Sequence, residues 1–182
     1  MTDPLGNELL RQARAAISEA LGGPPCPLPV NLPELNEPGA TFVTLTRAGE
    51  LRGCIGSLEA HRALALDVAQ NALAAAFRDP RFAPLARDEL AQIRVEVSLL
   101  SVAEPFPVVD EADAIARLRP GIDGVILSHG QRRATFLPQV WETLPEARQF
   151  LAQLKRKAGL PPELWDQQLQ LARYTVQKWQ ER

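Results

Sequence analysis

A strict alternation of apolar and polar residues between Ile93 and Leu99 constrains most strongly what this chain can fold into. Apolar residues occupy every second position, and charged or hydroxyl side chains lie between them. Because successive side chains of a β-strand point to opposite faces, this pattern predicts a strand with one buried face. The fold must therefore include a sheet that other elements cover on one side.

The residues before this strand predict a hairpin followed by a helix. The segments 41–46 and 51–58 are rich in β-branched and apolar residues, and the turn residues 47–50 separate them. That arrangement indicates two adjacent antiparallel strands. Apolar residues at helical spacing from Arg62 to Arg78, followed by the helix-ending pair Asp79-Pro80, then predict a helix.

The first forty residues predict a helix and an irregular connection. Apolar residues from Leu5 to Leu21 recur near a 3.6-residue period, and Gly22-Gly23 supplies the left-handed stop that helix ends favour. The stretch from Pro24 to Pro38 is rich in proline, which donates no backbone hydrogen bond. We therefore expect an extended, ordered crossing at 24–38.

The order of hairpin, helix and strand is predicted a second time. The elements expected in this second set are a short helix at 111–118, a hairpin at 124–137, a helix at 145–158 and a strand at about 169–176. Superposing the two hairpins pairs Gly49 with Gly130, Arg52 with Arg133 and Cys54 with Thr135. An internal duplication of a hairpin-helix-strand unit is therefore a hypothesis.

Composition restricts the class of protein. The chain has 182 residues, 46% of them hydrophobic, which suits one domain at 1–182, either undivided or built as a main lobe with a smaller one. The formal net charge is −2 and the pI is about 5.8, so any nucleic-acid contact needs a local basic patch. No apolar run approaches the ~20 residues of a membrane-spanning helix. With two cysteines and no signal-like start, we expect a cytoplasmic protein without disulfides.

Arg52 and Cys54 are the main candidates for chemistry. On a regular strand they share a face and lie ~6.6 Å apart along the backbone. A guanidinium that close stabilises a thiolate, which makes a cysteine nucleophilic or redox-active. Gly53 and Gly56 remove side chains on both sides of Cys54, which lets a ligand or another backbone come close. A small-ligand pocket over Arg52 and Cys54 is one interpretation.

The alternative interpretation of the same residues is structural. Cys54 then serves as a small buried residue beneath a helix, and Gly53 and Gly56 mark a bulge or a tight contact. Arg52 needs a carboxylate partner or a ligand, and the partner can be internal.

Other polar residues complete the candidate set. His61 is a candidate partner for the Cys54 thiol in a covalent mechanism, although it also suits an exposed helix start. The candidate ligand-binding residues are Arg52, Gly53, Gly56, Ser57, Arg81 and Gln139. The spacing of the two histidines and two cysteines gives no tetrahedral zinc motif, so we expect no metal and no cofactor.

Several motifs resemble one known family in its order. They are LRGCIGSLEAHRAL at 51–64, DPRFAPL at 79–85, a strand ending VSLLS, GIDGVIL at 121–127, FLPQV at 136–140, and KAGL at 157–160 followed by Trp165. Together they resemble the AmmeMemoRadiSam system protein A family, the AMMECR-type domain, from about Phe42 to the end of the chain. One departure is Lys155, which stands where that family often carries a cysteine and argues against a mechanism that needs two thiols.

The resemblance implies an α+β fold with a curved mixed, largely antiparallel β-sheet flanked by helices. It also implies functional association with Memo-type and radical-SAM proteins, and a suggested role in RNA modification. No reaction comes with it.

Two hypotheses follow for the function. In the first, the domain is a non-catalytic binding or accessory module for such partners or for RNA, acting as a monomer or homodimer. In the second, it is an enzyme that uses Cys54 as a reactive thiol and Arg52 to hold an anionic substrate group. The first is favoured, because the signature lacks a complete acid-base set.

Overall fold

The computed structural model describes residues 3–182, which form two compact units. The first unit extends to Leu100 and also includes Gln177–Arg182, and the second comprises Ser101–Val176. The fold of the chain is α+β, as expected from the sequence, but the strands form two four-stranded sheets instead of one. The described residues contain no helix with the length and apolar character needed to cross a membrane.

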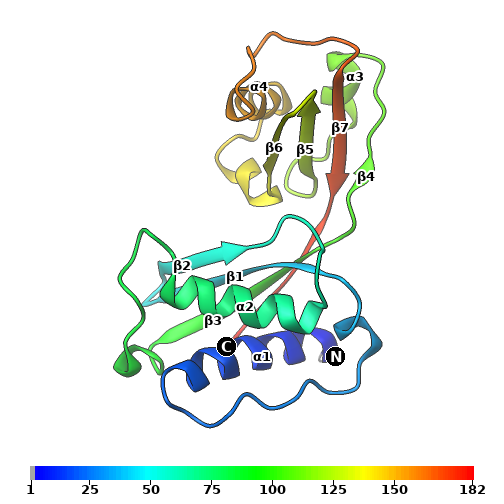
Figure 1. Ribbon diagram of the computed structural model, residues 1–182. Helices are drawn as coiled ribbons and strands as arrows, with labels where there is room; N and C mark the ends of the chain where they lie inside the picture. The colour runs from blue at the N-terminus through cyan, green and yellow to red at the C-terminus, as the bar shows by residue number, and fades with distance from the viewer. Residues whose placement is uncertain (1–2) are drawn as a thin grey trace. The chain divides into compact units, whose positions relative to one another are not determined.

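The helices and strands predicted from the sequence follow one another along the chain in the predicted order (Figure 1). The first unit contains α1 (Pro4–Ala20), η1 (Pro33–Leu35), β1 (Ala40–Arg47), β2 (Glu50–Gly56), α2 (Leu64–Phe77), η2 (Arg87–Glu89), β3 (Ile93–Leu100) and the greater part of β8 (Val176–Gln180). The second contains β4 (Glu104–Pro105), α3 (Glu111–Arg117), β5 (Gly124–His129), β6 (Arg132–Phe136), η3 (Pro138–Glu142), α4 (Ala147–Lys157) and β7 (Leu169–Tyr174).

The two sheets share one strand order, as the duplication hypothesis requires. The first sheet runs β2-β1-β3-β8, and the second, read from its hairpin edge, runs β6-β5-β7-β4. Each hairpin is therefore followed by a strand that pairs with the first arm of that hairpin. The aligned positions also share a contact, because the carbonyl of Cys54 accepts from Arg81 and that of Thr135 accepts from Lys157.

The fourth strand of each sheet comes from outside its own hairpin-helix-strand set. The chain leaves β3 of the first sheet and forms β4, which pairs with β7 of the second sheet. It then leaves β7 and forms β8, which joins β3. The sequence predicted a single strand at about 169–176, whereas the structure divides this region into β7 and β8. The two sets thus exchange their last strands.

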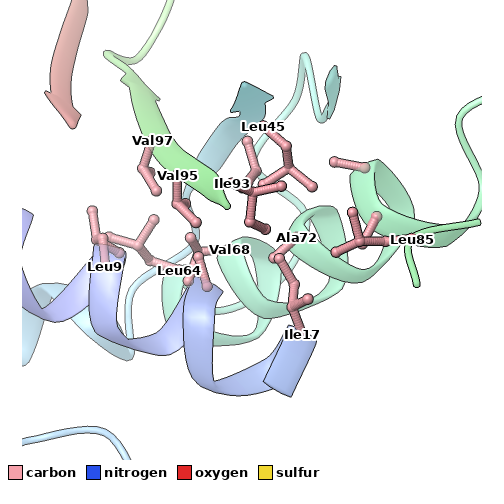
Figure 2. Packing of buried hydrophobic residues seen from close by; sticks show 14 of the residues in the cluster. Leu9, Ile17, Leu45, Leu64, Val68, Ala72, Leu85, Ile93, Val95 and Val97 are labelled. Carbon is pink, nitrogen blue, oxygen red and sulfur yellow. The ribbon is translucent and has the colours of Figure 1, made fainter. Parts of the chain in front are cut away.

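The core of the first unit lies between its sheet and the helices α1 and α2. Leu9 and Ile17 on α1 belong to the same buried cluster as Leu45 on β1 and Val95 on β3, and none of these four side chains has exposed surface (Figure 2). Ile93, Val95 and Val97 supply the buried face that their alternation predicted. The opposite face of this sheet carries the intervening polar side chains.

Polar contacts fix the N-terminus of α1 and the proline-rich connection that follows the helix. Asp3 caps α1 by accepting from the amide of Leu5 at 3.0 Å, and Pro4 follows at the first helical turn. On α1, the amide nitrogen of Gln12 donates to the carbonyl of Pro27 at 3.0 Å, and Glu8 accepts from the amide of Val30 at 3.2 Å. The proline-rich stretch is thereby fixed along α1.

A tight turn connects β1 and β2. Arg47 pairs with Glu50, which leaves a two-residue loop of Ala48 and Gly49 with φ values of 52° and 83°. Two consecutive positive φ angles are the mark of a type I′ hairpin turn. The turn fixes the register of the strand that carries the signature motif.

The core of the second unit centres on aromatic rings. Phe150 of α4 stacks on Trp141 at 3.8 Å between centroids and meets Phe136 edge-on at 5.3 Å. Lys155, also on α4, is fully buried, with its ammonium group 2.6 Å from Glu111 and 2.9 Å from the carbonyl of Pro162. Lys155 therefore joins α4 to α3 and to the loop after α4.

Candidate functional site

A β-bulge in β2 determines the direction of Arg52. Leu45 pairs with Gly53 and the next residue, Thr46, pairs with Leu51, so Arg52 has no partner on β1. Such an extra residue bends the strand and redirects its side chain. The expected common face of Arg52 and Cys54 assumed regular alternation, which the bulge interrupts.

Glu89 neutralises the charge of Arg52. The guanidinium donates two hydrogen bonds of 2.9 Å to the two carboxylate oxygens, a bidentate geometry. Glu89 also accepts from Arg47 at 2.8 Å and from the amide of Ala86 at 2.9 Å. The Arg52 side chain is only 14% exposed, and its guanidinium carbon lies 5.9 Å from the centre of the Phe82 ring. Of the two partners proposed for Arg52, the structure contains the internal carboxylate.

The Glu89 cluster leads to a prediction for acid stability. Hydrogen bonds from Arg52 and from the Ala86 amide lower the pKa of Glu89 from 4.5 to about 2. A carboxylate with a lowered folded-state pKa stabilises the protein above its unfolded-state pKa and loses this contribution as the pH falls. The free energy of unfolding should therefore decrease between pH 4.5 and about 2, and more steeply in the native protein than in Glu89→Gln.

Urea denaturation at pH 7, 4.5 and 2 tests this expectation. The native protein should be more stable than Glu89→Gln at pH 7, and the two curves should converge at the lowest pH. Other carboxylates contribute to both curves equally, so their difference isolates Glu89. Parallel curves across the window would contradict the assignment.

Asp79 and Arg81 cover the outer edge of β2 at Cys54. The amide of Cys54 donates to Asp79 at 2.9 Å, and its carbonyl accepts from Arg81 at 3.3 Å. Two further bonds, of 2.9 Å and 2.7 Å, join the Arg81 guanidinium to Asp79. These bonds from Arg81 hold the pKa of the buried Asp79 carboxyl well below its usual range. The pair thus satisfies backbone groups that an edge strand otherwise leaves unpaired.

The Cys54 thiol and the Arg81 guanidinium are two accessible polar groups of this edge. Cys54 is half-buried, and its sulfur lies 3.2 Å from the hydroxyl of Thr44 on β1. Arg81 is 53% exposed and lies 5.5 Å from the centre of the Phe82 ring. Arg81, rather than Arg52, therefore presents a positive charge beside the cysteine.

The two signature glycines permit close packing within the first unit. A Cβ atom added at Gly53 would lie 2.2 Å from the carbonyl oxygen of Ala75 on α2. One added at Gly56 would lie 2.3 Å from the ring of Phe42. The approach at Gly53 is a tight helix-strand contact, as the structural interpretation expected, whereas the approach at Gly56 is a tight contact with the neighbouring strand β1.

Ser57 belongs to a buried polar network around Asp67. The carboxylate of Asp67 has no exposed surface and accepts from the hydroxyl of Ser57 at 2.7 Å and from Arg62 at 2.8 Å. It also accepts from both the amide and the hydroxyl of Thr41 on β1. Ser57 therefore joins the end of the signature strand to α2.

The remaining candidates lie apart from these contacts. His61 is exposed, and Nδ1 of its ring lies 2.9 Å from the carbonyl oxygen of Glu59. Gln139 is exposed on η3, in the second unit. Within residues 3–182 no group of three histidine, cysteine, aspartate or glutamate side chains is arranged to hold a metal ion.

Sequence reasoning missed three residues that organise the site. They are Glu89, Asp67 and Thr44. Glu89 lies 37 positions from Arg52, so no local pattern joins them. Thr44 was predictable in principle, because the hairpin register places it opposite Cys54.

An AMMECR-type α+β domain with its signature motif on β2 is the class that this fold and site define. The AMMECR1 family model matches residues 10–179, and the chain belongs to that family. A protein of Methanothermobacter thermautotrophicus is 40% identical over 180 residues, covering 97% of this chain and 94% of its relative. A protein of Saccharolobus islandicus is 38% identical over 182 residues, covering 96% of this chain and 80% of its relative.

A solved structure supports the same fold. The uncharacterized protein PH0010 from Pyrococcus horikoshii superposes with a TM-score of 0.84 at 34% sequence identity. The match covers 100% of this chain and 93% of that one. The names of these relatives state no activity.

Proposed function

We propose that this protein is a non-catalytic binding module that works as an accessory to Memo-type and radical-SAM proteins. One observation carries the proposal: the charged side chains of Arg52, Asp79 and Arg81 in the signature region form ion pairs within the protein. Arg52 binds Glu89, and Asp79 binds both Arg81 and the Cys54 amide. A general acid-base mechanism needs groups positioned toward a substrate, whereas these groups stabilise the fold.

The surface that we assign to the partner surrounds the edge of β2 that Asp79 and Arg81 cover. Arg81 supplies a half-exposed guanidinium, and Leu51 and Leu58 near the two ends of β2 are exposed apolar side chains. Arginine and large apolar residues are the types that contribute most to protein interfaces. The partner class comes from the family resemblance, which also connects such modules with RNA modification.

Binding measurements with variants of this surface test the proposal. Purified Memo-type and radical-SAM proteins from the same genome are titrated into the protein by calorimetry. We expect direct binding to at least one of them, and Arg81→Gln should weaken it by about tenfold or more, as removal of an interface arginine often does. Cys54→Ser should bind as the native protein does.

Arg148→Gln is the matched control, because Arg148 is an exposed arginine of the second unit. It should leave the affinity unchanged. Circular dichroism of each variant separates loss of the surface from loss of the fold. No binding of the native protein to either partner, or equal weakening by both arginine variants, would refute the assigned surface.

The alternative function is an enzyme that uses the Cys54 thiol. The half-buried sulfur beside the exposed Arg81 favours it, although Arg52 no longer fits the role of anion holder because Glu89 occupies it. Iodoacetamide alkylation in a Cys26→Ser background discriminates between the two functions. The binding-module proposal expects Cys54 to react no faster than free cysteine at pH 7, and a rate at least about tenfold higher would support the enzyme.

A further inference from the structure

A separate open pocket of about 520 Å³ lies at the turn end of the first sheet. It is lined by Thr46, Ala48, Gly49, Gln92, Arg94 and Gln180. All six residues belong to the first unit. Neither the signature cysteine nor Asp79 or Arg81 contributes to it, so it is distinct from the site at the edge of β2.

Strand pairing brings the polar lining residues together. Thr46 on β1 is directly opposite Arg94 on β3, and β8, which ends at Gln180, is the other neighbour of β3. Arg94 is exposed and lies between the buried residues Ile93 and Val95. Its side chain is therefore on the face of the sheet opposite the helices.

The charge of Arg94 is not compensated within the described part of the chain. Arg47 and Arg52 share Glu89, and Lys178 lies 3.8 Å from Glu96. For Arg94, in contrast, no acidic side chain of residues 3–182 lies within ion-pair distance. The pocket lining contains no acid either, so its one ionised group is a guanidinium suited to an oxyanion.

The other lining groups indicate which chemical groups the uncharged part of a ligand carries. Gln92 and Gln180 carry amides, and Thr46 carries a hydroxyl, all of which exchange hydrogen bonds with alcohol groups. None of the six side chains is aromatic, so the pocket offers no ring on which a nucleobase stacks. Gly49 has no neighbouring atoms within 4 Å of an added Cβ, which leaves the rim at the turn open.

We propose that this pocket binds a small sugar phosphate, with the phosphate on Arg94 and the sugar hydroxyls on Thr46, Gln92 and Gln180. The proposal is independent of the partner surface at β2, because the two sets of residues do not overlap. It assigns the exposed face of the first sheet a ligand-binding role that the signature motif does not provide.

A nuclear magnetic resonance titration with ribose 5-phosphate tests the site. We expect saturable shifts of the backbone amides of Thr46, Gly49 and Arg94, with a Kd of about 1 mM, a typical affinity for a small ligand in an open pocket. Arg94→Gln should weaken binding by about tenfold or more, since a charge-assisted bidentate contact is lost. Arg148→Gln, in the second unit, should not change it.

Three comparisons sharpen the result. Ribose and inorganic phosphate alone should each bind about tenfold more weakly than ribose 5-phosphate, because each retains only part of the contacts. Equally tight binding of inorganic phosphate would refute the sugar subsite, and tighter binding of adenosine monophosphate would refute the choice of a sugar over a nucleotide. No saturable shift, or identical titrations of the native protein and Arg94→Gln, would overturn the site.

Arg94→Gln should bind the protein partners with the same affinity as the native protein. A failure of the sugar-phosphate site can therefore be distinguished from a failure of the partner surface.

Discussion

Replacing Asp67 with asparagine is expected to lower the free energy of unfolding by about 3–5 kcal/mol, as breaking a buried ionic network does. All the groups that contact this carboxylate are donors: the amide and hydroxyl of Thr41 at 2.8 and 2.7 Å, Ser57 at 2.7 Å, Arg62 at 2.8 Å and Asn71 at 3.0 Å. An asparagine has nearly the same shape but replaces one acceptor oxygen with a donor. The new amide nitrogen would then face at least one group that can only donate, the Arg62 guanidinium or the Thr41 amide, at a position with no exposed surface, at about 1–3 kcal/mol for each unsatisfied group.

Urea denaturation and thermal melting measure this effect. A loss of this size corresponds to a decrease in melting temperature on the order of 10 °C for a chain of this length. Asp88→Asn is the matched control, because Asp88 is exposed on η2, and its change should stay within about 0.5 kcal/mol. If Asp67→Asn were as stable as this control, the network would not hold β1, the signature strand and α2 together.

The second large effect is expected for Gly53→Ala, at about 3 kcal/mol, the upper part of the range for an overpacked core. The added methyl carbon would lie 2.2 Å from the backbone carbonyl of Ala75, and a helix backbone cannot move aside as a flexible side chain can. Either α2 or β2 must shift, and both carry core residues.

Gly49→Ala provides the comparison for this substitution. Gly49 lies on the same hairpin with φ of +83°, but an added Cβ would have no atom within 4 Å. Its cost should be about 1 kcal/mol, which reflects the left-handed backbone alone. Equal losses for the two variants would contradict the close helix-strand contact as the reason for glycine at position 53.

Local patterns in the sequence predicted the elements that have a clear period. The alternation from Ile93 to Leu99 gave β3, and the helical spacing after Arg62 gave α2, because burial on one face imposes these periods. The two-residue strand β4 and the division between β7 and β8 carry no such period. Their pairing depends on residues distant in the chain, so the expectation of one sheet instead of two had no local signal against it.

The strand that carries the candidate site was predicted, but the contacts of its side chains were not. The signature motif pointed to β2, yet the bulge at Arg52 leaves no trace in the alternation of the residues around it. Arg52 was correctly expected to need either a ligand or an internal carboxylate, and only the folded chain identifies Glu89. Likewise, Arg94 appears in sequence as an ordinary exposed strand residue, and its position in a pocket depends on β1, β3 and β8 meeting.

The exchange of last strands between the two hairpin-helix-strand sets has a consequence for biosynthesis. A ribosome produces β8 only after all of Ser101–Thr175, so the nascent first sheet displays the open edge of β3 throughout that interval. The pairing of β8 with β3 joins residues more than 70 positions apart, as the contact of Val95 with Glu181 illustrates. Pairings between such distant residues slow folding. The first unit therefore completes its sheet only after the second unit has been synthesised. If translation stalls within the second unit, β3 keeps an unpaired edge that can pair with the strands of other chains.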